Sequence, residues 1–420
     1  MVLLSVTSLK GEGRDLRLVE AAREGDRETL SRLLQEQVDV NLAPLDGATA
    51  LHWAAHRGDL GAVQLLIGAG AGVDAANAYG VTPLSLACTN RNFPLVEKLL
   101  EAGADPNSTR WTGETVLMTC VRTGRLSAVK SLLNHGADPN VRENRWEQTP
   151  LMWAVGGGHP AVTGALVEHG ADVQARSKAG FTALMFAAQQ GDMDLAQMLL
   201  AAGANVNDTT PEHGNVLTVA SASGHEALSI FLLEKGAEPN SPNSHGVTPL
   251  HFAVPQGLST FDGLKYDDFY RVLPPNMPEL VKALLAHGAD PNPQITQSNP
   301  LGPDAPASGV GMVGQTPLFL AALAGDVEII RFLGANGADV QLAAGGFSAK
   351  GTTPLIAAAG VSRYRWKGTL DRTLGDPLGT IKVLVKLGAD VNQSNSQGQT
   401  AMHSAAFTGK DDIIQFLADQ

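Results

Sequence analysis

The residues with the greatest catalytic potential in this chain are its eleven histidines, its two cysteines and a few paired acids. Histidine and cysteine could bind a metal or act as base and nucleophile, and neighbouring carboxylates such as Asp267–Asp268 could exchange protons. However, the chain contains no H-E-x-x-H, G-x-S-x-G or C-x-x-C motif. The glycine run 156–158 lacks the Lys-Ser/Thr that a phosphate-binding loop requires. The sequence therefore predicts no enzyme, no metal site and no cofactor.

A second group of residues combines aromatic rings with positive charge, which suits recognition rather than catalysis. A planar guanidinium beside an indole favours carboxylates and peptides as ligands. The group recurs at intervals of about one repeat between positions 79 and 178. It comprises Tyr79, Arg110, Trp111, Arg142, Arg145, Trp146, Arg176 and Lys178, and we call it the finger stripe.

The elements that position these residues follow from an internal repeat. Aligned on a Thr or its equivalent, units begin at Leu16, Thr49, Thr82, Thr115, Thr149, Thr182, Asn215, Thr248, Thr316, Thr353 and Thr400. Spacings up to Thr248 are 33 or 34 residues, and Gly-Ala pairs follow most anchors at a fixed distance. The chain therefore consists of about eleven similar units, the last one incomplete.

Each unit is predicted to hold two helices and an extended finger. The anchor Thr can cap a helix, and Pro follows it in five units, where its missing N–H costs nothing. This first helix, helix A, ends near a glycine such as Gly58 or Gly124. An apolar stripe such as Val96, Leu99 and Leu100 then marks helix B.

The period and the sequence Thr248-Pro249-Leu250-His251-Phe252-Ala253 resemble the ankyrin repeat and its T-P-L-H-x-A motif. The resemblance covers residues 15 to 420, and the part from Thr49 to about Asn292 looks most like the long ankyrin arrays of bacterial proteins. It implies an all-α fold, an ankyrin-repeat α-solenoid of about eleven helix-turn-helix units with β-hairpin-like fingers. Ankyrin geometry would place the fingers side by side near the concave surface of the A helices.

The repeat predicts the following divisions of the chain. They are a leader (1–14), an N-capping repeat (15–47), six regular repeats (48–247), a repeat with an inter-helix insertion (248–292, insertion 254–277), a long finger loop (293–314), a repeat (315–351), a second repeat with an insertion (352–398, insertion 360–379) and an incomplete terminal repeat (399–420).

Repeat positions account for eight of the eleven histidines, leaving His56, His213 and His245 without such an explanation. Cys88 and Cys120 replace small residues of adjacent A helices. Because stacked helices lie about 8 to 10 Å apart, beyond the roughly 7 Å Cα limit for a disulfide, we expect two buried thiols.

Two alternatives exist for the finger stripe. It could bind a partner together with His56, Arg57, Asn90, Arg122 and Gln190 of the A helices. Otherwise Trp111 and Trp146 pack between neighbouring fingers while the arginines pair with Glu114, Glu143 and Glu147.

The two insertions are the other candidate surface. They are rich in aromatic and basic residues, namely Tyr266, Phe269, Tyr270, Arg363, Tyr364, Arg365 and Trp366. Aromatic side chains bring large contact area to an interface, so these residues could bind a partner. They could equally fold back and cover their own repeats as Ω-like loops.

Composition limits the function further. The formal charge of −12 disfavours a general nucleic-acid binder, and no apolar run is long enough to cross a membrane. We therefore predict a cytoplasmic, monomeric scaffold that binds a protein or peptide, unless a partner covers its C-terminal end. One alternative is a small molecule or glycan bound at the insertions. A less favoured one is a hydrolase between them, using Asp262, Asp267, Tyr270 or His245 around Arg365.

Overall fold

The computed structural model describes residues 15–254, 277–296, 313–345, 350–360 and 375–420. These residues form 22 helices, nearly all of them in consecutive pairs, and one two-stranded antiparallel sheet of β1 (Thr209–Thr210) and β2 (Gly214–Asn215). Within these ranges no helix has the length and apolar character needed to cross a membrane. The predicted all-α architecture is confirmed.

The chain divides into two compact units. Unit 1 comprises Met1–Phe186 and Gln197–Ala204, and unit 2 comprises Ala187–Ala196 and Asn205–Gln420, so that α11 (Ala183–Gln190) and α12 (Met193–Ala201) contribute to both. The other helices of unit 1 are α1 (Arg17–Glu24), α2 (Arg27–Gln35), α3 (Ala50–Arg57), α4 (Leu60–Gly68), α5 (Pro83–Thr89), α6 (Phe93–Glu101), α7 (Val116–Arg122), α8 (Leu126–Asn134), α9 (Pro150–Gly156) and α10 (Pro160–Glu168). Those of unit 2 are α13 (Val216–Ala222), α14 (Glu226–Glu234), α15 (Pro249–Ala253), α17 (Pro278–Ala286), α18 (Pro317–Ala324), α19 (Val327–Ala335), α20 (Pro354–Gly360), α21 (Pro377–Lys386), α22 (Ala401–Thr408) and α23 (Asp411–Asp419).

The A helices begin at the predicted anchors. The Thr82 hydroxyl accepts a hydrogen bond from the Ser85 N–H at 3.2 Å, and Thr115 and Thr316 cap their helices in the same way. At the other end, Gly58 has a φ of 71°, a left-handed conformation in which a side chain is disfavoured. Local chemistry therefore fixes both ends of helix A.

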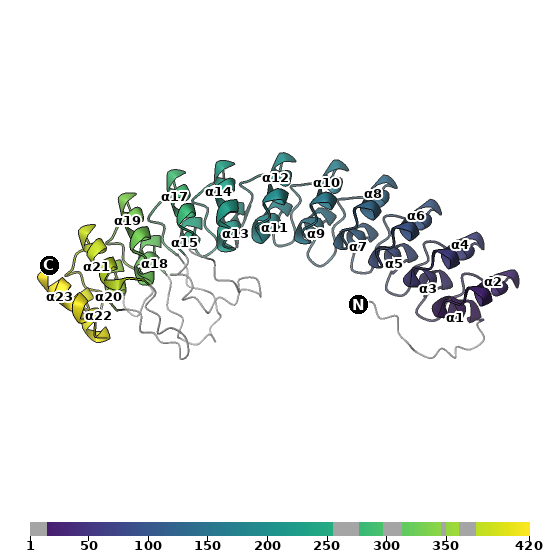
Figure 1. The fold of residues 1–420 in the computed structure, drawn as a ribbon, viewed down its shortest axis with the longest axis horizontal. Coiled ribbons are helices and arrows are strands. Elements are labelled where there is room, and N and C mark those ends of the chain that lie inside the picture. The colour runs from purple at the N-terminus through teal and green to yellow at the C-terminus, as the bar shows by residue number, and fades with distance from the viewer. Residues whose placement is uncertain (1–14, 255–276, 297–312, 346–349, 361–374) are drawn as a thin grey trace. The chain divides into compact units, whose positions relative to one another are not determined.

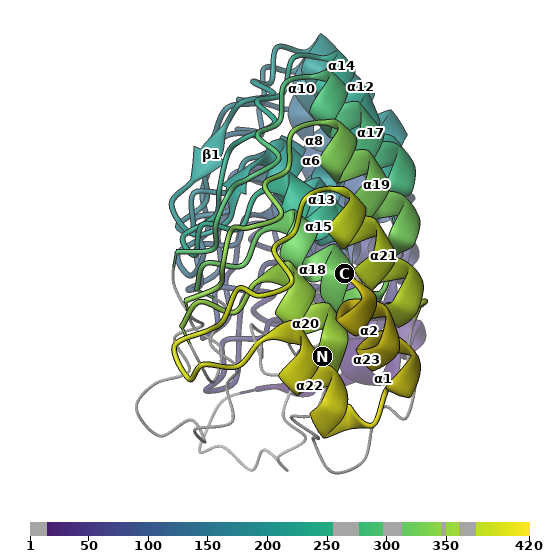
Figure 2. The ribbon, with the colours of Figure 1, turned by 90° about the vertical axis from the view of Figure 1, so that its left-hand side faces the viewer.

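Within each of the two compact units the helices form two layers. A helices contact neighbouring A helices and B helices contact neighbouring B helices, as in the series α13, α15, α18, α20 and the series α14, α17, α19, α21 of unit 2. Figure 1 shows the pairs in chain order, and Figure 2 shows for unit 2 that the extended fingers project away from the B helices. The core lies between the layers, where Leu99, Leu132 and Leu284 have no exposed surface.

Hydrogen bonds from side chains join successive repeats at the end of helix B. The Asn107 amide donates to the Gly136 carbonyl at 2.9 Å, and its Oδ1 accepts from the Asp138 N–H at 2.8 Å. Equivalent pairs of bonds are made by Asn41, Asn140, Asn207, Asn240 and Asn292. We call this series the asparagine ladder. It satisfies backbone groups that the helix ends leave without partners.

The expectation of two free thiols is wrong. Cys88 of α5 and Cys120 of α7 form a disulfide, and their Cα atoms are 4.8 Å apart. The prediction used the distance between helix axes. Residues on the facing sides of two helices lie much closer than the axes do.

Candidate partner-binding surface

Four successive fingers of unit 1 each expose one large apolar side chain. Leu45 is 92% exposed, Tyr79 55%, Trp111 74% and Trp146 53%. Trp111 and Trp146 therefore do not pack between neighbouring fingers as one of the two sequence interpretations required. Leu45 is not among the predicted residues, although it lies four residues before its anchor Thr49, just as Trp111 lies four residues before Thr115.

Backbone hydrogen bonds hold these fingers side by side. The Ala78 N–H donates to the Asp46 carbonyl at 2.8 Å, and the Lys178 N–H donates to the Trp146 carbonyl at 2.8 Å. The Asn144 N–H joins the third and fourth fingers through the Thr112 carbonyl at 2.9 Å. Between the second and third fingers, a Cβ added at Gly80 would lie 3.0 Å from the Arg110 Cα, so these backbones are also in close contact. The exposed side chains consequently lie on adjoining fingers, one on each.

The fourth finger contains one more residue than the third and holds it in an unusual conformation. Glu147 adopts a φ of 54°, where other fingers place glycines such as Gly80 and Gly113. The buried Glu143 carboxylate accepts hydrogen bonds from the backbone N–H groups of Arg145 and Trp146, both at 2.7 Å, and of Gln148 at 3.1 Å. A buried carboxylate thus organises the turn that presents Trp146.

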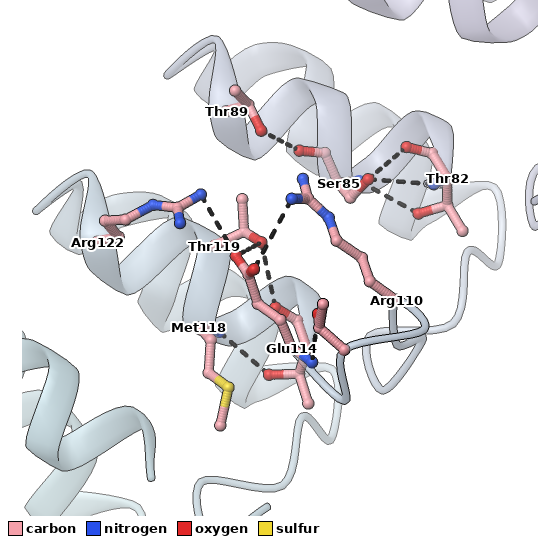
Figure 3. A network of polar contacts seen from close by, with 10 residues as sticks. Thr82, Ser85, Thr89, Arg110, Glu114, Met118, Thr119 and Arg122 are labelled. Atoms are coloured by element: carbon pink, nitrogen blue, oxygen red, sulfur yellow. Dashed lines mark hydrogen bonds and ion pairs between the residues drawn. The ribbon is translucent and has the colours of Figure 1, made fainter. Parts of the chain in front are cut away.

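Two arginines, one on the third finger and one on α7 of the next repeat, share one carboxylate. Arg110 lies 3.8 Å from Glu114 Oε2, and Arg122 lies 3.3 Å from Oε1, which also accepts a hydrogen bond from the Thr119 hydroxyl at 3.1 Å. Figure 3 shows both guanidinium groups pointing at Glu114 from the finger and from α7. Arg110 is mostly buried, while Arg122 is 52% exposed and lies 5.6 Å from the ring centroid of Trp153. Only Arg122 of this pair can reach a ligand without rearrangement.

The remaining cations of the stripe differ in how they are held. Arg145 lies 5.1 Å from the ring centroid of Trp146, and both side chains face solvent. Arg142 donates to the Arg176 carbonyl at 2.9 Å and lies 3.9 Å from Glu147. In the part of the chain that the structure describes, Arg145 and Lys178 have no ion-pair partner. The predicted pairing of arginines with acids therefore occurs for only part of the stripe.

Two of the helix A residues predicted to bind a partner make hydrogen bonds to the preceding A helix. Arg57 donates to the Arg23 carbonyl at 3.2 Å, and the Asn90 amide donates to the carbonyls of Ala55 at 3.2 Å and His56 at 2.6 Å. All three carbonyl groups lie near the end of the preceding A helix. Exposed His56 packs edge-on against Trp53, and Gln190 is also exposed.

The residues predicted at the insertions lie outside the described residues. These are Tyr266, Phe269, Tyr270, Arg363, Tyr364, Arg365 and Trp366, together with Asp262 and Asp267. Most of the long finger loop, residues 297–312, lies outside as well. Of the two other histidines without a repeat explanation, His213 is half-buried near the Thr210 hydroxyl, and burial lowers its pKa. The His245 carbonyl accepts from the Thr296 N–H.

The buried histidines of the repeat motif join neighbouring repeats. His251 Nδ1 accepts from the Thr248 N–H at 3.1 Å, which leaves Nε2 to donate to the Gln315 carbonyl at 3.2 Å. His52 makes the same two bonds, with Thr49 and with Val81. Burial lowers the pKa of His251 to about 4 and also lowers that of His52. Both rings are therefore neutral structural groups at pH 7.

The same repeats are recognised by comparison with known families. The chain matches the family "Ankyrin repeats (3 copies)" over residues 18–110, 117–210, 184–266 and 272–365. Residues 375–418 match "Ankyrin repeats (many copies)", and residues 245–295 match "Ankyrin repeat". The chain belongs to the ankyrin-repeat family. Proteins of this family are generally non-catalytic, and they typically mediate protein–protein interactions.

Individual relatives of this ankyrin-repeat protein match over short stretches. It is 49% identical over 37 residues to "Notch-regulated ankyrin repeat-containing protein A" of Danio rerio and to the corresponding protein of Homo sapiens. These matches cover 9% of the chain and about a third of each relative. The "ankyrin repeat domain of Bcl-3: a unique member of the IkappaB protein family" is 28% identical, covers 52% of the chain and 98% of its own length, and has a TM-score of 0.47.

The described part of this ankyrin array contains no cluster of three or more His, Cys, Asp or Glu side chains that could hold a metal ion. Its most prominent surface feature is the row of exposed apolar fingertips with adjacent cations. Such a surface suits association with another macromolecule, because large aromatic side chains contribute most of the binding energy at interfaces.

Proposed function

We propose that this ankyrin array is a non-catalytic scaffold that binds a protein or peptide partner on the finger stripe. The observation that carries the proposal is the row of four exposed apolar side chains, Leu45, Tyr79, Trp111 and Trp146, on adjoining fingers. Large apolar groups gathered in one row on a protein surface are typical of interaction sites, whereas scattered ones are not.

The construction of the fourth finger supports the same surface. A residue other than glycine in the left-handed region costs about 1 kcal/mol or more. Glu147 has that conformation, and the buried Glu143 carboxylate supports the turn with three backbone hydrogen bonds. Strained backbone that its surroundings hold in place is common at functional sites. Here the strained segment presents Trp146 and Arg145.

The test is affinity capture from a lysate of the source cells, quantified by mass spectrometry. Baits are the wild-type chain, Trp111→Ala/Trp146→Ala, and a control that also removes two exposed apolar side chains but elsewhere, Leu65→Ala/Phe407→Ala. Leu65 is 42% exposed on α4, and Phe407 is 75% exposed on α22. Circular dichroism of all three baits establishes that the helices are retained.

The proposal requires a protein captured by wild type and control but lost from the stripe variant. Because a central Trp at an interface contributes about 2 kcal/mol or more, the double variant should lose capture at least thirtyfold. Equal capture by the stripe variant and the wild type would show that the finger stripe is not the binding surface.

Three finer points from the sequence remain predictions. They are the likeness to bacterial arrays, the cytoplasmic location and the monomeric state. The location has a direct test, since disulfides are rare in reducing compartments. Rapid alkylation during cell lysis, followed by mass spectrometry of the Cys88 and Cys120 peptides, reports whether the disulfide exists in the cell.

A further inference from the structure

We propose that the partner of the finger stripe contributes an extended acidic segment, with apolar residues at about every third position and Asp or Glu between them. This inference rests on the proposed function, because it names the chemistry of the ligand for the same surface.

The finger stripe is positive in a negative chain. The third, fourth and fifth fingers (108–115, 141–148 and 174–181) together with Arg122 carry six cations and three carboxylates. The whole chain has a formal charge of −12. A local excess of positive charge of this kind favours a negatively charged ligand.

The carboxylates of the stripe are largely occupied. Glu143 is buried and accepts three backbone N–H groups. Glu114 is shared by two arginines and a threonine hydroxyl. Glu147 is the one exposed acid of the three, and it lies 3.9 Å from Arg142. The positive charge that faces solvent is therefore not cancelled by neighbouring acids.

Three cations are available to a ligand. Arg145 and Lys178 are exposed and have no ion-pair partner within the described ranges. Arg122 makes one ion-pair contact with Glu114 through Nη2, and its guanidinium lies over Trp153. A guanidinium held near an indole keeps its orientation while its remaining N–H groups stay free to bind a carboxylate.

The fingers also set the spacing of the ligand. Each finger belongs to one repeat, and stacked helices lie about 8 to 10 Å apart. A peptide in the extended polyproline II conformation has three residues per turn and advances about 3.1 Å per residue. Every third side chain therefore lies on one face, and one finger corresponds to about three residues of ligand. Apolar side chains at every third position would reach successive exposed fingertips, which are Tyr79, Trp111 and Trp146. The residues between them would lie near the cations.

A peptide fits these observations better than a nucleic acid does, although aromatic and basic groups together can also bind single strands. A phosphate backbone places a charge at every nucleotide and favours an uninterrupted positive surface. The exposed Glu147 interrupts the stripe between Arg142 and Lys178. A peptide can place an apolar or uncharged residue opposite this acid.

The experiment is selection of a random 16-residue peptide library, displayed on phage, against the full chain. The recovered sequences report acid content and apolar spacing directly. The consensus peptide, fluorescently labelled, is then titrated by anisotropy with wild type, with Arg145→Gln/Lys178→Gln, with Arg122→Gln and with the control Lys130→Gln. Lys130 is an exposed cation on α8, away from the fingers.

The inference predicts acid-rich peptides with apolar residues three apart. It also predicts an affinity about tenfold lower for Arg145→Gln/Lys178→Gln, because two exposed charge contacts are lost, and an unchanged affinity for Lys130→Gln. Recovery of peptides without an excess of acidic residues would overturn the inference. It would also be overturned if the charge variants bound the peptide with an affinity within twofold of wild type. Tighter binding of a 30-nucleotide single strand than of the peptide at 150 mM salt would overturn it too.

Failure of the inference can be separated from failure of the proposed function. If no selected peptide requires Trp111 and Trp146 for binding, the proposed acidic ligand is wrong, even when capture of a protein from the lysate requires both tryptophans. Should capture not depend on them, the proposed function itself is wrong.

Discussion

Lowering the pH from 7 to 5 should loosen the repeat that contains His251. In the folded chain this imidazole is buried, its Nδ1 accepts from the Thr248 N–H, and its pKa is about 4. In the unfolded chain the pKa should be near the ordinary value of about 6.5. Protonation places a hydrogen on Nδ1, where it faces another donor, so the protonated ring favours the open state.

The sign and size follow from linkage. A base whose folded pKa is lowered contributes stability above its unfolded pKa, and the contribution is lost as the pH falls through the window from about 6.5 to about 4. At pH 5 the unfolded histidine is almost fully protonated and the folded one is almost neutral. The loss relative to pH 7 is about 2 kcal/mol, or an increase of about thirtyfold in the opening constant.

Amide hydrogen exchange followed by mass spectrometry measures this locally, after correction for the intrinsic pH dependence of exchange. The peptide covering residues 248–254 should lose protection at pH 5. Helix α9 is the internal control, because its Thr149 caps a helix in which Met152 takes the place of the histidine. Its protection should change much less.

The variant His251→Ser separates the histidine from the other titrating groups. Serine can serve as a cap at this position, since the Ser85 hydroxyl accepts from the Thr82 N–H at 3.1 Å in its own repeat. The variant should show weaker protection at pH 7 but little change between pH 7 and pH 5. If it kept the full pH dependence, or if wild type changed less than threefold, the reasoning about the buried ring would be wrong.

Four further substitutions test other parts of the array. Asp74 takes the place of an asparagine in the asparagine ladder and has no side-chain N–H to donate to the Gly103 carbonyl. Asp74→Asn should therefore raise the free energy of unfolding by about 0.5–1.5 kcal/mol, and Asn107→Asp should lower it by a similar amount. Urea denaturation measures both changes. The disulfide between Cys88 and Cys120 closes a loop across 32 residues. Cys88→Ser should therefore lower the free energy of unfolding by up to about 3–4 kcal/mol and speed amide exchange in α5 and α7. Two alkylatable thiols in the unreduced protein would contradict the bridge. Glu147→Gly relieves the left-handed backbone and should raise the melting temperature, corresponding to about 1 kcal/mol; a lower melting temperature would show that the side chain contributes more than the strain costs.

The helix ends could be predicted because their signals are local. A Thr anchor followed by Pro and later by Gly determines helix A within a few residues, and the structure places caps at Thr82, Thr115 and Thr316. The contacts that join repeats were harder to predict. The Asn107 amide bonds a carbonyl 29 residues away, and no local pattern indicates that such a side chain faces the next repeat.

The finger stripe was predicted as a set of residue types, but not in its electrostatic detail. Arginines close to acids in the sequence suggested that each arginine forms an ion pair. In the structure the Glu143 carboxylate accepts hydrogen bonds from backbone N–H groups, and Glu114 is shared by two arginines. The disulfide was missed because helix spacing was used in place of the distance between facing Cα atoms. Each of these errors concerns how side chains meet across repeats.

The bridge between α5 and α7 also has a mechanical consequence. Repeats normally contact only their neighbours, so a pulled array can unravel one unit after another. The disulfide transmits the pulling force directly between Cys88 and Cys120, which are 32 residues apart, so the segment between them cannot be extended while the bond is intact. About 110 Å of contour length is thereby withheld, at roughly 3.4 Å per residue. The withheld stretch contains Trp111 and Arg110, so under tension the bridge would keep part of the finger stripe from being pulled out into an extended chain.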